Sequence, residues 1–136
     1  MIIFFILSFI KGKIFNIINL LIIGETIINR IIKIIVRRER PILINLVEES
    51  SFSFPSGHTM VAVTLYGFLI YLINKSKLNK RVKIILNICL ILLISLIIIS
   101  RIYLGVHFFS DCASGIFLAL AYLLTIINVL ERKKIL

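Results

Sequence analysis

The sequence has few charged residues, and acidic residues are the scarcest among them. Aspartate and glutamate together number 6 against 16 lysines and arginines, and charged residues make up 16% of the 136 positions. Hydrophobic residues make up 60%, with a mean hydropathy of +1.13. This excludes a soluble globular domain, whose apolar share is about 45–50%. Long apolar runs separate the basic residues, which also excludes a disordered tail or a nucleic-acid-binding protein.

Cysteine is also scarce. Cys89 lies inside an apolar run and Cys112 lies beside a polar cluster. Two such residues do not make a disulfide framework. We expect both to be small, buried, apolar side chains.

The apolar runs predict an all-α integral membrane protein with a single domain. A spanning helix needs about 20 mostly apolar residues. Four such runs, bounded by charge, lie at about 14–36, 56–73, 84–100 and 108–130. A fifth apolar piece, at residues 1–10, is about half the length of a span and indicates the stub of a helix. We therefore expect a bundle of about four transmembrane helices over residues 1–136, with its core at about 14–130.

The basic loops predict the orientation of the bundle, because lysine and arginine in short loops stay on the cytoplasmic side. The lysine-rich loop at 75–83 is therefore inside, together with the basic ends near 11–13 and 132–134. This predicts a multi-pass protein of the cytoplasmic membrane, with residues 37–55 and 101–107 facing outward. The outward arginines break the charge rule, and an anionic ligand would explain them.

The first polar cluster lies at the end of the first span. Lys33 and Arg40, which precedes Pro41, are seven residues apart, or two turns of a continuous helix, so both are expected on one face. Ionisable groups at membrane depth are candidates for function. The plainer alternative is that Lys33 snorkels and the arginines bind lipid headgroups. Further back in the same span, Glu25 and Asn29 also share a face.

The second cluster, Pro55-Ser56-Gly57-His58, opens the second span. A proline at the first helical position, with Ser53 or Ser56 as the cap, is an ordinary helix start. That alternative does not explain Gly57 or the titratable His58. A helix N-terminus presents unpaired N–H groups, and glycine lets an anion approach them closely. The segment is therefore predicted to bind phosphate.

The third cluster is Ser100-Arg101 followed by His107 and Asp111. The last two are four residues apart and are expected to be adjacent on one helix face. The carboxylate can then orient the imidazole as a nucleophile or a base. The alternative is an interfacial histidine, with Asp111 stabilising the start of a helix.

All three clusters fall on the outward face of the predicted topology. Together they supply three cations, an anion-binding helix start, two histidines and a carboxylate, as phosphoryl transfer requires. No cluster of carboxylates could hold a pair of magnesium ions. The sequence therefore predicts metal-independent chemistry that uses no cofactor.

The three blocks, in this order and at these spacings, resemble the type 2 phosphatidic acid phosphatase (PAP2) family of lipid phosphate phosphatases, whose site is shared with vanadium haloperoxidases and bacterial acid phosphatases. The resemblance covers roughly residues 20–120 and implies a PAP2/haloperoxidase-like helical core. It implies that His107 attacks phosphorus and forms a phosphohistidine, that Asp111 holds the imidazole, and that His58 protonates the leaving oxygen. It further implies that the phosphoryl oxygens are bound by Lys33, Arg40, Arg101, Ser56 and Gly57.

The implied partners are the bilayer and a membrane lipid carrying a phosphomonoester or diphosphate. Undecaprenyl diphosphate, phosphatidylglycerophosphate and phosphatidic acid all remain open as substrates. Apolar surfaces bind the lipid tail, and such surfaces leave no recognisable motif in the sequence. Membrane members of the family usually carry the first motif at the end of their third span, so helices equivalent to the first two are expected to be missing. This leaves open an activity that is weak or that depends on a homo-oligomer.

Two other functions are considered beside the phosphatase. One is a homologue that binds lipid phosphates without turnover. The other is a voltage-sensing or ion-conducting protein, suggested by the spacing of Arg30, Lys33, Arg37 and Arg40. The second predicts countercharges in the neighbouring spans, and residues 59–73 and 84–100 contain none.

Overall fold

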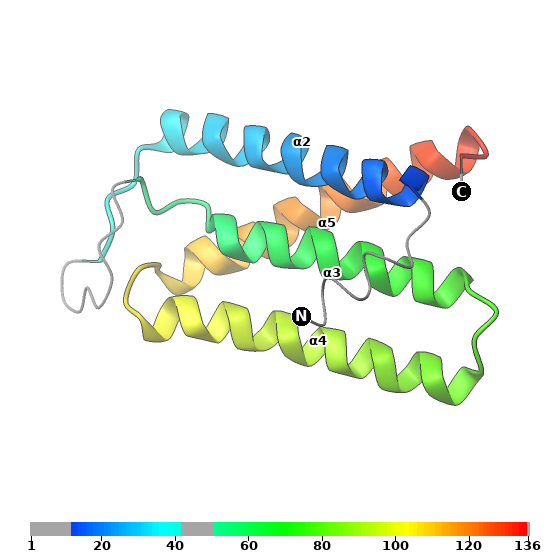
Figure 1. Ribbon diagram of the computed structural model, residues 1–136. Coiled ribbons are helices and arrows are strands. Elements are labelled where there is room, and N and C mark those ends of the chain that lie inside the picture. The colour runs from blue at the N-terminus through cyan, green and yellow to red at the C-terminus, as the bar shows by residue number, and fades with distance from the viewer. Residues whose placement is uncertain (1–11, 42–50, 136) are drawn as a thin grey trace.

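The computed structural model of the chain describes residues 12–41 and 51–135, and all regular structure within them is helical. Four helices follow one another in these residues (Figure 1): α2 (Gly12–Val36), α3 (Gly57–Lys75), α4 (Lys80–Tyr103) and α5 (Phe109–Arg132). Each corresponds to one of the predicted spans, which confirms the all-α architecture. The apolar stub predicted at residues 1–10 lies outside the described residues.

Three of these helices, α3, α4 and α5, are long and apolar enough to cross a membrane. Helix α4 has no buried side chain, and its isoleucines and leucines are exposed along its length. An apolar surface of this extent requires lipid around it. Helix α2 has the length of a span, but it carries Glu25, Arg30 and Lys33 and is not among the three.

Side-chain caps set where the helices begin. The Ser56 hydroxyl accepts a hydrogen bond from the Thr59 N–H at 3.4 Å, so α3 starts at Gly57. Pro55 precedes this cap and lies outside the helix, so the alternative that places it at the first helical position does not hold, whereas Ser56 does act as the cap.

Helix α4 also begins at a capping residue. The Asn79 side chain accepts from the Arg81 N–H at 2.9 Å, and the helix therefore starts at Lys80. The apolar run predicted a start at Ile84, because hydropathy marks where lipid contact begins and the cap marks where helical hydrogen bonding begins.

Helix α3 is the centre of the bundle and packs against α2, α4 and α5. One set of buried apolar side chains, remote from the start of α3, is Ile18, Leu21, Phe68, Leu123 and Leu130. A second set, nearer the start of α3, is Met60, Val63 and Ala119. Helix α5 crosses the first turn of α3 so closely that a Cβ at Gly115 would lie 3.2 Å from the Ser56 carbonyl oxygen. The starts of α3 and α5 are thus packed directly against each other.

The antiparallel path of the chain brings the polar clusters to one end of the bundle. The ends of α2 and α4 and the starts of α3 and α5 all lie there (Figure 1). The lysine-rich loop between α3 and α4 lies at the opposite end, with the start of α2 and the end of α5. The three clusters therefore share one face, as the sequence predicts.

Candidate active site

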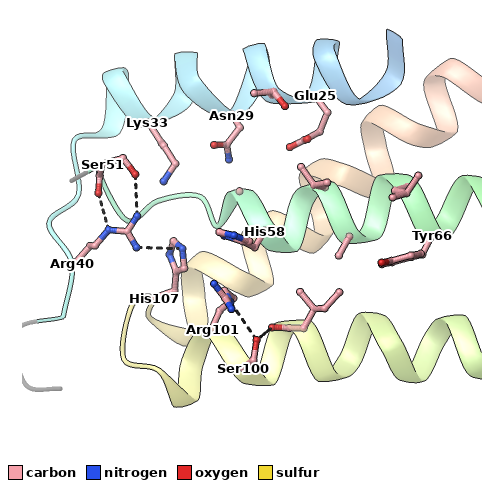
Figure 2. A pocket seen from close by; sticks show the side chains of 16 residues that line it. Glu25, Asn29, Lys33, Arg40, Ser51, His58, Tyr66, Ser100, Arg101 and His107 are labelled. Atoms are coloured by element: carbon pink, nitrogen blue, oxygen red, sulfur yellow. Dashed lines mark hydrogen bonds between the residues drawn. The ribbon is translucent and has the colours of Figure 1, made fainter. Parts of the chain in front are cut away.

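A cavity of about 480 Å³ opens at the end of the bundle where the polar clusters meet. Residues of α2, α3 and α4 line it, together with residues that precede α3 and α5. Figure 2 shows the basic and imidazole side chains of the lining turned toward a common space, and these are Lys33, Arg40, His58, Arg101 and His107. All three predicted clusters therefore contribute to one cavity, and both imidazoles line it.

His107 lies at the base of this cavity beside Asp111. It is 3% exposed, and its Nδ1 is 3.5 Å from Oδ2 of the fully buried Asp111. Its Nε2 is 3.5 Å from Nη1 of Arg40. A proton on Nδ1, on the side of the carboxylate, leaves the Nε2 lone pair directed at the Arg40 guanidinium and the cavity. An imidazole held in this way can act as a nucleophile.

The two residues meet in a different way from that predicted. Helix α5 begins at Phe109, so His107 precedes the helix and does not share a helix face with Asp111. The carboxylate approaches His107 because Phe108 is extended, with φ −72° and ψ 155°. Oδ2 of Asp111 also accepts the Phe108 N–H at 3.0 Å, so the alternative role at the helix start is present as well.

Arg38 is a site residue that the sequence interpretation missed. Its Nη1 lies 2.8 Å from Oδ1 of Asp111 and 2.7 Å from the Ser110 hydroxyl, and its guanidinium lies 4.2 Å from the centre of the Phe108 ring. The buried carboxylate of Asp111 is thus shared between Arg38 and His107. The sequence did contain a signal, the arginine-rich segment at 37–40. This segment indicated an anionic partner but did not identify that partner as Asp111.

Arg40 reaches the cavity from outside the helix that carries Lys33. Helix α2 ends before Arg37, whose φ is +50° and whose N–H is bonded to the Lys33 carbonyl at 2.9 Å. The prediction that both cations lie on one helix face is therefore wrong, although both line the cavity. Arg40 is held by the carbonyls of Ser51 and Val106, each at 2.7 Å, so it joins three segments of the chain.

The start of α3 contributes Gly57 and His58 to the cavity, while Ser56 lies behind them. A Cβ on Gly57 would stand 3.2 Å from Oδ1 of Asn29, so a side chain here would crowd the cavity wall. Ser56 is fully buried and is not among the lining residues. Its hydroxyl accepts hydrogen bonds from the N–H and the hydroxyl of Thr59, so it has the alternative role of helix cap. Its contact with phosphate stays a prediction.

Arg101 enters from the last turn of α4. Its Nε is 3.2 Å from the Ser100 hydroxyl, which itself donates to the Ile97 carbonyl at 2.7 Å. Figure 2 shows the Arg101 guanidinium on the side of the cavity opposite α2. The cavity is therefore bounded by cations on two sides.

The fold and the site together define the class of protein. The model of the PAP2 superfamily matches residues 14–135, and the chain belongs to this superfamily. Phosphatidylglycerophosphatase B of Bacillus subtilis strain 168 is 42% identical over 107 residues, which are 74% of this chain and 51% of that protein. The chain thus spans about half the length of this relative.

The structural comparison agrees with the family. The crystal structure of a transmembrane PAP2-type phosphatidylglycerolphosphate phosphatase from Bacillus subtilis matches with a TM-score of 0.78 and 34% identity. The match covers 85% of this chain and 58% of that one. This chain is therefore a multi-pass membrane protein with a PAP2 helical core.

Proposed function

We propose that this chain is a phosphatase that removes a terminal phosphate from a membrane lipid. The observation that carries the proposal is the buried His107–Asp111 pair at the base of a cavity lined by Lys33, Arg40 and Arg101. Three cations around one nucleophile suit a bound phosphate and its transition state. The phosphatidylglycerophosphatase relative supports a lipid phosphate as the substrate. A homo-oligomer stays a prediction.

The chemistry has two steps in the proposed mechanism. In the first, Nε2 of His107 attacks phosphorus, the bond from phosphorus to the lipid oxygen breaks, and His58 gives its proton to that oxygen. The products are a phosphohistidine and the lipid alcohol, or the lipid monophosphate when the substrate is a diphosphate. In the second, water attacks the phosphohistidine while His58 accepts a proton, and inorganic phosphate leaves. His107 keeps its Nδ1 proton throughout, and the Asp111 carboxylate stays ionised and orients the imidazole.

Charge neutralisation in this mechanism comes from the chain itself. Lys33, Arg40 and Arg101 contact the equatorial oxygens, and the N–H of Gly57 adds a donor at the positive end of α3. Loss of one such donor typically lowers a rate by about 10²–10³-fold. In the described part of the chain, no three histidine, cysteine or acidic side chains gather into a metal-binding group.

Phosphate release from defined lipids tests this function. Purified protein in detergent with excess chelator is expected to release phosphate from at least one of phosphatidylglycerophosphate, phosphatidic acid and undecaprenyl diphosphate, at the rate seen without chelator. The colorimetric phosphate assay is the readout. Binding without release from any of the three would support a lipid-phosphate-binding protein instead. Release that stops on chelation would refute the metal-independent mechanism.

We also propose that the active site faces outward from the cytoplasmic membrane. The lysine-rich loop between α3 and α4 lies at the far end of the bundle from the cavity, and such loops stay in the cytoplasm. The arginines at the cavity end of the bundle break the rule that basic residues stay in the cytoplasm. A phosphate that enters the cavity from outside the cell would account for them.

Cysteine labelling in intact cells tests this orientation. Leu78 in the basic loop is changed to cysteine in a variant without Cys89 and Cys112, and a matched variant carries the cysteine at Tyr103. A membrane-impermeant maleimide is expected to label position 103 in intact cells and position 78 only after lysis. The reverse pattern would place the cavity on the cytoplasmic side.

A further inference from the structure

The cavity is much larger than a phosphate. Its volume is about 480 Å³. The cations and His107 occupy one part, and the rest is lined by Glu25, Asn29, Tyr66 and apolar side chains of α3 and α4. If the proposed function holds, this inner part receives the portion of the lipid next to the scissile phosphate.

Glu25 is the unusual residue of this inner part. It is 0% exposed, and neither carboxyl oxygen has a hydrogen-bond partner within residues 12–41 and 51–135. Figure 2 shows its carboxyl group directed from α2 toward the cavity, one turn before Asn29. Asn29 is held in place, because its amide donates to the Pro55 carbonyl at 3.2 Å. A buried polar group without a partner is costly, so Glu25 is expected to gain one from the bound molecule.

A second buried oxygen lies in α3. The Thr64 hydroxyl is buried, and no described residue bonds to it. Thr64 is not among the residues that line the cavity, whereas Glu25 is. Of these two buried oxygen-bearing side chains, only that of Glu25 can meet a molecule bound in the cavity.

We propose that Glu25 is a specificity-determining residue that hydrogen-bonds the polar linker of a glycerolipid. A carboxyl group accepts from a hydroxyl, and in its protonated form it donates to an ester oxygen. A phosphate does not belong here, because Lys33 lies two helical turns away, about 12 Å along α2. The subsite therefore favours glycerolipid phosphates over polyprenyl phosphates, since a hydrocarbon chain would leave the buried carboxyl without a partner.

The test compares kcat/KM for phosphatidic acid and for a polyprenyl monophosphate in detergent. The wild type is expected to prefer phosphatidic acid, and Glu25→Leu is expected to lower that preference by about 10–100-fold. Glu25→Gln keeps a hydrogen-bond donor and an acceptor, so this variant is expected to retain most of the preference for phosphatidic acid. Glu131→Leu is the matched control, because Glu131 is exposed at the other end of the bundle and should leave the ratio unchanged.

Thermal unfolding separates this role from a structural one. Glu25→Leu replaces a buried, unpartnered carboxyl with an apolar side chain, so its melting temperature is expected to rise. An unchanged ratio, an equal loss on both substrates, or a lower melting temperature would overturn the proposal. The absence of release by the wild type from either lipid would instead refute the phosphatase function itself.

Discussion

Replacing His107 with alanine is expected to lower phosphate release by about 10⁴-fold or more, because the variant lacks the only group proposed to bond to phosphorus. Initial rates in detergent measure the loss. In the wild type, lipid labelled in its terminal phosphate is expected to leave a labelled protein that is stable to alkali and sensitive to acid, as a phosphorus–nitrogen bond is. His107→Ala is expected to carry no label.

His58→Ala supplies the control for this experiment. It retains the nucleophile, so an aryl phosphate, whose leaving group needs no proton, is expected still to label the protein. Hydrolysis of the phosphoenzyme should then be slow, because the base is missing. Label that persists in His107→Ala, or a rate close to that of the wild type, would assign the nucleophile to another residue.

Substitutions in the Asp111–Arg38 pair are also expected to have large effects, on both the rate of phosphate release and the stability. Asp111→Asn is expected to lower the rate by about 10³–10⁴-fold, because an amide no longer holds the Nδ1 proton of His107. Arg38→Gln removes the cation at 2.8 Å from a fully buried carboxylate. We expect it to lower the rate by about 10–100-fold and the free energy of unfolding by about 1–3 kcal/mol. This stability effect is smaller than the loss of about 3–5 kcal/mol typical of breaking a fully buried pair, because the Arg38 side chain is 36% exposed.

A double-mutant cycle tests whether the two residues act together. Once Arg38 is glutamine, the further change of Asp111 to asparagine is expected to cost less stability than in the wild type, since the asparagine leaves no unpaired charge. Unfolding in detergent and initial rates are measured on all four proteins. Changes in unfolding free energy that simply add would contradict coupling through the 2.8 Å contact.

The residues that the sequence places in the site are those that interrupt apolar runs. Lys33, Arg101 and His107 are conspicuous because charge or an imidazole at membrane depth is rare, and the structure brings all three to one cavity. The starts and ends of helices were less predictable. The side-chain cap at Ser56 sets the start of α3, and the positive φ at Arg37 sets the end of α2. The hydropathy of the sequence indicates neither feature.

The sequence by itself determined the four helices of the described chain, their alternating direction and the end at which the polar clusters meet, because lipid solvation and charge act on each run separately. Only the tertiary structure decided that Arg38 holds Asp111 across 73 positions and that Glu25 is buried without a partner. Both depend on how α2 packs against α3 and α5. No local pattern records the contacts between helices, since the same apolar face can meet lipid or another helix equally well.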